Sequence, residues 1–167
     1  MRKFNTKVIA LGGIIAALYV TLTFISSIFG LASGAIQIRI SEALCVLPCF
    51  AGAAVPGLFV GCFISNLLFG GGVLDAVIGS VITLLAAIAT KIIGKYVTSS
   101  IRKYLAVLPP ILLNAFILPI VMDLCFNLSD GYWYLFATIF AGEFISAGVL
   151  GVLFYIFIGK HITFFRR

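Results

Sequence analysis

Charged residues are scarce in this sequence. Of its 167 residues, 11 are Lys or Arg, 5 are Asp or Glu and one is His, so that charged residues make up 10% of the chain. An ordinary soluble domain carries about 25%. Hydrophobic residues make up 63%, and a soluble fold of this size has to cover most of its surface with polar groups. The composition excludes a soluble enzyme and a disordered tail, and indicates one domain, residues 1–167, embedded in lipid.

The positively charged residues are clustered along the sequence instead of being evenly distributed. The formal net charge of +6 by itself suggests a nucleic-acid partner. Ten of the eleven basic residues, however, fall into three clusters that flank two long apolar stretches: Arg2, Lys3 and Lys7; Lys91, Lys95, Arg102 and Lys103; Lys160, Arg166 and Arg167. Basic residues flank membrane spans on the cytoplasmic side. We therefore expect a multi-pass plasma-membrane protein of prokaryotic type, with no nucleic-acid partner.

The lengths of the two apolar stretches predict the number of crossings. A helix needs roughly 20 residues to cross the hydrocarbon core, so the first stretch fits four crossings and the second fits two. Both termini are then cytoplasmic. The class is an all-α integral membrane protein, with six transmembrane helices predicted at 8–29, 41–54, 56–69, 73–95, 105–127 and 132–159. Because Pro48 and Pro56 shorten the second and third helices, the turn at 54–57 should lie partly buried.

The few polar side chains of the spans lie in their predicted outer halves. Asn66, Asn114 and Glu143 each lie roughly ten residues from a helix end, about 15 Å deep. Groups at that depth are costly and usually face a bundle interior or a cavity. Closer to the outer loops lie Gln37, Arg39, Glu42, Asp75, Asp123, Trp133 and Tyr134. The pattern predicts a polar pocket in the outer half.

The deep polar residues also have a structural interpretation. Asn66 and Asn114 can serve as interhelical hydrogen bonds without any ligand. Glu143 differs, because a lone carboxylate near the midplane needs a proton or a partner. Glu143 is therefore the residue that most favours a functional role.

The residues near the outer loops have structural alternatives too. Arg39 and Glu42 are spaced i, i+3 and can form an ion pair on one helical turn. Asp75 can be a charge that stabilises the start of a helix through the helix dipole. Trp133 and Tyr134 can belong to an interfacial aromatic belt instead of a stacking platform.

Catalytic and metal-binding patterns are weak. The four cysteines have no histidine near them in sequence, and Gly70–Gly72 lacks the Lys and Ser/Thr of a phosphate-binding loop. We expect no enzyme, no metal and no cofactor, and the sequence shows no ATPase motif of its own. Two alternatives stay open: an intramembrane enzyme that pairs carboxylates such as Asp75 and Asp123, and a secondary carrier driven by protons through Glu143.

The first predicted helix carries a stripe of small residues. Ala10, Gly13, Ala17 and Thr21 recur at three and four residues, with Gly12 and Ala16 beside them. Small residues let helix backbones approach closely in lipid. The stripe predicts a helical partner, either in this chain or in another subunit.

Three segments together resemble one known family. They are the runs 37–48 (QIRISEALCVLP), 54–62 (AVPGLFVGC) and 74–80 (LDAVIGS), and Asn66, Asn114 and the pair Gly142-Glu143 extend the likeness over nearly the whole chain. The sequence resembles the QueT family, the substrate-binding S components of energy-coupling factor (ECF) transporters for queuosine precursors. The Arg-x-Ser-Glu-Ala-Leu run followed by Leu-Pro is the most specific part.

The resemblance implies a function and its partners. It implies a six-helix S component that binds a 7-deazaguanine or queuine, with another vitamin-like ligand as the alternative. It also implies that small residues of the first helix, Gly12, Gly13, Ala16 and Ala17, dock onto a transmembrane coupling subunit energised by two cytoplasmic ATPases. The family's usual motif there is Ala-x-x-x-Ala, and this chain has two Gly-x-x-x-Ala registers instead.

The ligand chemistry suggests roles for the polar residues. A carboxylate can accept from the ring N1–H and the 2-amino group of a deazaguanine together, and Glu143 is the first choice for this. Asn66, Asn114 and Gln37 can pair with the other edge, and Trp133 or Tyr134 can stack on the base. Asp75, Asp123 or Glu42 can pair with a ligand amine, while Arg39 can tether a gate through Glu42.

Overall fold

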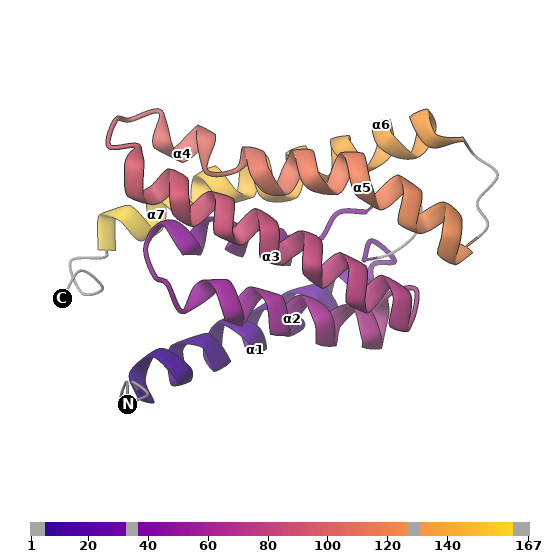
Figure 1. Cartoon of the computed structure of the whole chain (residues 1–167), viewed down its shortest axis with the longest axis horizontal. Coiled ribbons are helices and arrows are strands. Elements are labelled where there is room, and N and C mark those ends of the chain that lie inside the picture. The colour runs from indigo at the N-terminus through magenta and orange to yellow at the C-terminus, as the bar shows by residue number, and fades with distance from the viewer. Residues whose placement is uncertain (1–5, 33–36, 127–130, 162–167) are drawn as a thin grey trace.

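A computed structural model describes residues 6–32, 37–126 and 131–161, and the regular elements in these ranges are all helical. Figure 1 shows the longer helices running roughly along the long axis of the molecule. In chain order the elements are α1 (Thr6–Ile28), η1 (Ile40–Cys49), α2 (Ala54–Phe69), α3 (Val73–Tyr96), α4 (Arg102–Leu105), α5 (Leu108–Phe126), α6 (Tyr132–Glu143), η2 (Phe144–Leu150) and α7 (Gly151–His161). Here η1 is a 3-10 helix and η2 a π-helical segment.

The helices confirm a membrane protein of the all-α class. Four of them are long and apolar enough to cross a membrane, namely Thr6–Ile28, Val73–Tyr96, Arg102–Asp123 and the continuous helix Tyr132–His161 formed by α6, η2 and α7. Their outer faces expose many large apolar side chains, such as Ile14, Leu85 and Phe157, as expected where lipid is the solvent. α2 and η1 are shorter apolar helices, and the count of six crossings stays a prediction.

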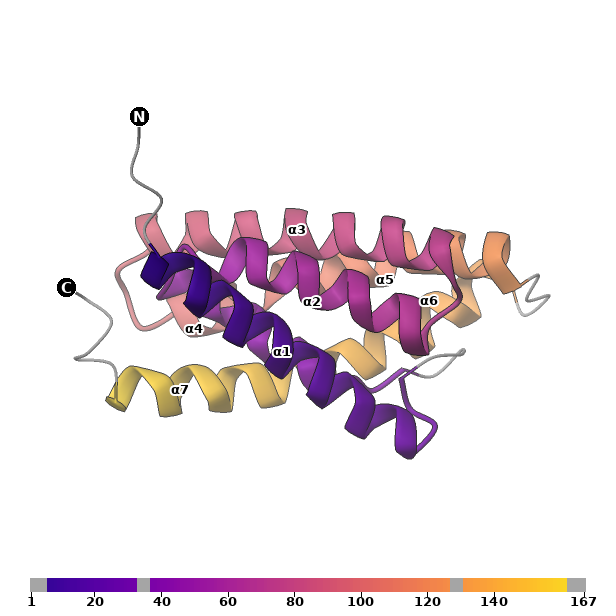
Figure 2. The same ribbon diagram turned by 90° about the horizontal axis from the view of Figure 1, so that it is seen from below.

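The described residues of the three basic clusters, which were predicted to share a side, lie at one end of the bundle (Figure 1 and Figure 2). The start of α1, the end of α3 with α4, and the end of α7 are all at the left in Figure 1. These ends carry Lys7, the four basic residues from 91 to 103, and Lys160, whereas Arg2, Lys3, Arg166 and Arg167 lie outside the described residues. This arrangement agrees with an even number of crossings between clusters. That the shared end is cytoplasmic stays a prediction.

The predicted second helix is the main correction. Instead of a helix over 41–54, the chain forms a ten-residue 3-10 helix that ends at Cys49, with Pro48 inside it. A proline lacks the N–H that an α-helical bond requires, and a 3-10 helix rises about 2.0 Å per residue, so ten residues cover roughly 20 Å. Residues 54–57 begin α2 instead of forming a turn, and they are partly buried, as predicted: Ala54 and Gly57 are buried and Pro56 is exposed.

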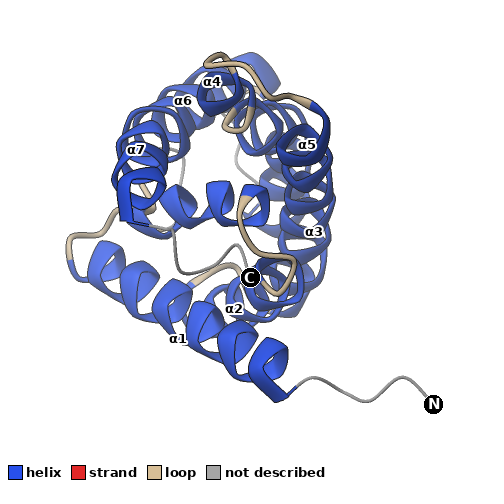
Figure 3. Cartoon of the chain, turned by 90° about the vertical axis from the view of Figure 1, so that its left-hand side faces the viewer, coloured by secondary structure: helices blue, strands red, loops and turns tan. Residues whose placement is uncertain are grey.

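The 3-10 helix η1 forms the centre of the molecule. Figure 3 shows it inside the ring made by the other helices, and most of its side chains are buried. One core cluster joins Leu44 and Cys45 to α1, α2 and α3, and a second joins Val46 to α5, η2 and α7. η1 therefore links the two halves of the bundle.

Small residues bring α1 and α2 into close contact. A Cβ added at Gly57 would lie 2.7 Å from the Gly12 carbonyl oxygen, and one added at Gly61 would lie 3.1 Å from Ala16 Cα and 2.8 Å from Tyr19 Cβ. Neither position has room for a side chain. Part of the predicted small-residue stripe, Gly12 and Ala16, therefore packs within this chain.

We expect Gly61→Leu to destabilise the fold. Adding methylenes to a well-packed contact costs about 1–3 kcal/mol, which for a chain of this size lowers Tm by roughly 2–12 °C. The matched control is Gly13→Leu on α1, since a Cβ at Gly13 has no atom within 4 Å. Thermal unfolding in detergent measures both, and equal melting of the two variants would contradict the close packing of α1 and α2.

Candidate functional site

Four charged side chains lie buried inside this apolar bundle: Arg39, Glu42, Asp75 and Glu143. Arg39 is 8% exposed and Glu143 is 6% exposed. Ionisable groups inside a membrane protein are expensive and are usually paired and functional. All four were predicted as site residues, and the contacts of each indicate what it does.

Arg39 is held by hydrogen bonds that tie the first loop to α2. Its Nε donates to the Ala32 carbonyl at 2.7 Å, and its Nη1 donates to Asn66 Oδ1 at 2.7 Å. Asn66 Nδ2 in turn donates to the Asp75 carbonyl oxygen at 3.2 Å. This network joins the loop, α2 and α3 into one polar wall, in which Asn66 makes the interhelical bonds expected from its structural interpretation.

Two glycines make room for that wall. A Cβ at Gly79 would lie 2.4 Å from Asn66 Nδ2, and one at Gly70 would lie 2.3 Å from Asp75 Oδ2. Asp75 lies in the first turn of α3, and its Oδ2 accepts a hydrogen bond from the Gly71 N–H at 3.0 Å. Asp75 therefore lies where its structural alternative placed it, and it also accepts from the backbone that precedes the helix.

Glu42 has partners different from those of Arg39. The Tyr19 hydroxyl donates to Glu42 Oε1, and the Cys45 thiol donates to Oε2 at 3.2 Å. One carboxylate oxygen is thus bonded to α1 and the other to η1 itself. Arg39 and Glu42 therefore bond to different partners, although their i, i+3 spacing would allow an ion pair.

Of these four side chains, Glu143 is the one with a buried oxygen that lacks a hydrogen-bond partner among the described residues. Asn114 Nδ2 donates to Oε1 at 2.8 Å, which links α5 to α6. Oε2 is buried and has no hydrogen-bond partner among the described residues, and the same holds for Ser146 Oγ three residues further on. A buried acceptor left without a donor costs roughly 1–3 kcal/mol, more when charged. This oxygen is therefore suited to accept from a ligand.

The helix changes geometry directly after Glu143. Residues Phe144–Leu150 are π-helical within an otherwise continuous helix, and π segments occur frequently at functional sites. The segment after Glu143 packs against η1, the element that carries Glu42, through both η2 and α7. Glu143 thus belongs to the same buried polar region as η1 and its preceding loop.

Gln37 lies against the same helix. A Cβ at Gly142 would meet the Gln37 carbonyl oxygen at 1.8 Å, so only glycine permits this approach of loop to helix. The Gln37 amide donates to Met122 Sδ at 3.3 Å. The Gln37 backbone therefore lies against Gly142, the residue before Glu143.

Three predicted site residues lie apart from the buried region. Asp123 is exposed near the end of α5, while Trp133 is 73% and Tyr134 51% exposed at the start of α6. Trp133 packs edge-on against Tyr132 and Phe136. The structure does not bring these three to Glu143, and their contact with a ligand stays a prediction.

Several buried polar side chains escaped the sequence analysis. Tyr19 is fully buried against Glu42, Thr23 Oγ1 donates to Ser41 Oγ at 2.8 Å, and Thr83 Oγ1 donates to Cys62 Sγ at 3.2 Å. Tyr19 and Thr23 lie on the face of α1 that also carries Ala16. Their spacing from Ala16, three and seven residues, was a signal that could have identified them.

The small-residue stripe of α1 has two faces. Gly12 and Ala16 pack against α2, as described above. Gly13 and Ala17 are exposed, together with Ala10 and Thr21. The exposed face is the one that remains available to a partner helix.

The chain matches the model of one protein family, described as QueT transporter, over residues 9–160. No curated protein and no solved structure matches it.

Proposed function

Because the chain belongs to the QueT transporter family, a family of ECF S components, we propose that it binds a queuosine precursor and delivers it to an ECF coupling module. Membership of a transporter family and four long apolar helices make it a multi-pass plasma-membrane protein with a small-molecule substrate. The proposal adds the identity of the ligand, the residues that bind it and the source of energy.

Glu143 Oε2, which has no hydrogen-bond partner in the part of the chain that the structure describes, carries the proposal for the ligand. A 7-deazaguanine presents a ring N–H and an amino group on one edge, and a carboxylate can accept from both. Asn114 holds the other oxygen and fixes the orientation of the carboxylate. Ser146 Oγ, also buried without a partner among the described residues, is placed on the same helix to pair with a further polar atom of the ligand.

The remaining polar residues shape the site in this proposal. Arg39 and Asn66 pin the first loop to α2, and Asp75 secures the start of α3. Gln37 lies beside Gly142 and contributes to the ligand's second edge. Glu42 is within reach of a ligand amine. Asp123, Trp133 and Tyr134 come into contact with a ligand only if the outer ends of α5 and α6 move inward.

The exposed face of α1 is the proposed contact with the coupling subunit. Gly13 and Ala17 offer a flat, side-chain-poor surface of the kind that lets two helices approach closely in lipid. Gly12 and Ala16, the other register, are occupied by α2. The two ATP-binding subunits act through the coupling subunit at the basic, cytoplasmic end.

Mass spectrometry of the molecule that co-purifies with the protein tests the ligand class. We expect a 7-deazapurine mass to be released from the purified wild-type protein. The matched sample is Thr138→Val, whose hydroxyl bonds only to carbonyls of its own helix, and it should release the same molecule. Release of a different vitamin-like mass from both would overturn the queuosine assignment.

Uptake into vesicles tests the source of energy. Uptake should require the coupling subunit, both ATP-binding subunits and ATP. Uptake by this chain alone under a proton gradient would instead favour the secondary carrier, for which the buried Glu143 would be the proton site.

A further inference from the structure

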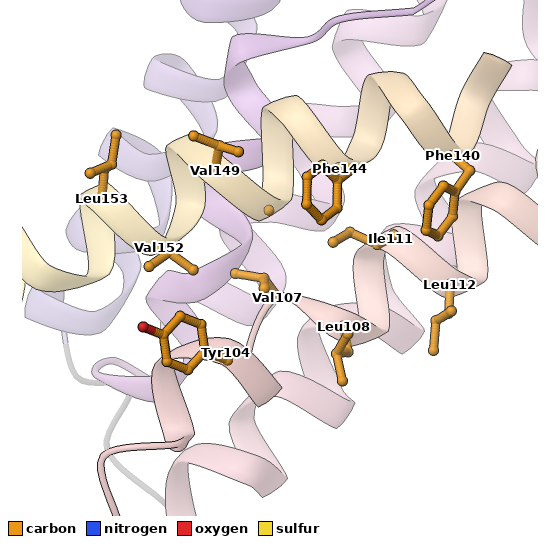
Figure 4. A pocket seen from close by; sticks show the side chains of 11 residues that line it. Tyr104, Val107, Leu108, Ile111, Leu112, Phe140, Phe144, Val149, Val152 and Leu153 are labelled. Carbon is orange, nitrogen blue, oxygen red and sulfur yellow. The ribbon is translucent and has the colours of Figure 1, made fainter. Parts of the chain in front are cut away.

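A groove on the outside of the bundle is not part of the polar region. It has a volume of about 510 Å³, within the usual range for small-molecule sites, and it runs between α5 and the continuous α6–η2–α7 helix (Figure 4). Except for Tyr104, its lining is apolar: Val107, Leu108, Ile111, Leu112, Phe140, Phe144, Gly148, Val149, Val152 and Leu153.

Two stacked phenylalanines and one glycine shape the groove. Phe140 and Phe144 are stacked with ring centroids 6.4 Å apart and planes at 22°, and both are exposed. Gly148 lies on the floor, where an added Cβ would be in ordinary contact with Ile111 Cδ1 at 3.4 Å. From Phe140 to Leu153 the helix rises roughly 20 Å, more than the depth of one leaflet at about 15 Å. The shape suits a long, thin apolar chain.

One end of the groove is basic. Tyr104 lies at that end, next to Val152 in Figure 4, and Lys103 Nζ lies 5.0 Å from the centroid of its ring. The neighbouring Arg102 is directed elsewhere, because it donates to the Tyr155 hydroxyl and to the Gly94 carbonyl. Lys103 is therefore a cation in contact with the residue that lines this end of the groove.

We propose that this groove binds one phospholipid with an anionic headgroup, whose acyl chain lies between α5 and η2 and whose phosphate pairs with Lys103. An apolar groove that ends at a basic residue on the basic side of a membrane protein matches both parts of such a lipid. α1 lies on the other side of the helix ring (Figure 3), so that this site is separate from the docking face of α1. It does not depend on the identity of the transported substrate.

Native mass spectrometry of the whole chain, with phosphatidylglycerol and phosphatidylcholine of the same acyl chains as probes, tests the headgroup. A lysine near the membrane surface favours an anionic lipid by a factor of about five, so one phosphatidylglycerol should be retained roughly five-fold better than phosphatidylcholine. Lys103→Gln should abolish this preference. Lys95→Gln is the matched control, since Lys95 Nζ lies 5.1 Å over the ring of Tyr96, at the same end of the bundle but outside the groove. Equal retention of both lipids by the wild type, or an equal loss in both variants, would overturn the proposal.

A photoreactive residue tests the position of the acyl chain. Benzoylphenylalanine in place of Phe144, which is 54% exposed in the groove, should form lipid adducts in protein that is purified in detergent with one phosphatidylglycerol retained. The same residue at Val81, an exposed position on α3, should form several-fold fewer, because the bulk lipid that faces α3 in a membrane has been removed. In addition, Gly148→Leu should reduce the retention of both lipids by filling the floor. Adducts at position 144 with another protein, whether a second copy or the coupling subunit, would overturn the lipid assignment.

Discussion

Glu143→Gln is expected to weaken the binding of a 7-deazaguanine by about 100-fold or more while leaving the fold intact. Oε1 of Glu143 already accepts from Asn114 at 2.8 Å, and Oε2 has no partner among the described residues. A glutamine has only one acceptor oxygen. If that oxygen faces Asn114, the amide N–H₂ group faces the ligand's donors, and the ligand edge loses its charge-assisted bonds.

The magnitude follows from the bonds lost. Hydrogen bonds to a charged group are worth about 1.5–3 kcal/mol each, and each 1.4 kcal/mol corresponds to a factor of ten in Kd. Two such bonds therefore account for about 100-fold or more. The unbound protein tolerates the change because a neutral amide nitrogen replaces a buried carboxylate oxygen that has no donor among the described residues. Isothermal titration calorimetry in detergent measures the effect.

Thr138→Val on the same helix separates recognition from general damage to α6. Its hydroxyl bonds to the Tyr134 and Leu135 carbonyls, so binding should remain within a factor of two. Full-strength binding by Glu143→Gln would exclude Glu143 from the site. Such a result would not contradict the transport function, and Glu42 and Asp75 would then be the candidate ligand contacts.

Hydropathy and charge predict most of this fold, because the membrane imposes both. Long apolar runs ended by glycines and basic clusters predict the bounds of α1, α3 and the Tyr132–His161 helix to within a few residues. The same signals mislead at η1. Its residues are as apolar as those of a spanning helix, and nothing in hydropathy distinguishes a buried 3-10 helix from a lipid-facing α-helix.

The buried charges were also predictable, but their partners were not. With only five acids in the chain, any acid placed deep in a span is a candidate, and Glu42, Asp75 and Glu143 are indeed buried. Which donor meets which oxygen depends on helix rotation. The spacing from Ala16 indicates which face of α1 carries Tyr19, but nothing in the sequence pairs the Tyr19 hydroxyl with Glu42. The pairing of Asn114 with Glu143 likewise needs α5 and α6 placed side by side.

Gly13→Leu and Ala17→Leu are expected to reduce uptake at least ten-fold while ligand binding by the purified subunit stays unchanged. Both residues are exposed, and a Cβ at Gly13 meets no atom within 4 Å, so leucine at either position leaves the fold undisturbed. It would, however, hold a partner helix away. Overpacking of this kind costs about 1–3 kcal/mol, and helices in lipid associate through close packing and have no hydrophobic force to compensate.

Three measurements on the same variants locate the defect. Binding is measured in detergent, uptake in proteoliposomes with the complete transporter, and association by co-purification of the coupling subunit. Ala137→Leu, an exposed alanine on α6, is the matched control and should behave as wild type in all three.

The interpretation of each variant depends on which small residues of α1 contact the coupling subunit. Gly12 and Ala16 are already packed on α2, so that leucine there would disturb folding and binding together. Leucine at Gly13 or Ala17 can act only on what lies outside this chain. A loss of uptake with retained binding therefore requires a partner on that face. Normal uptake in both variants would mean that the coupling subunit docks elsewhere and that the exposed half of the stripe contacts only lipid.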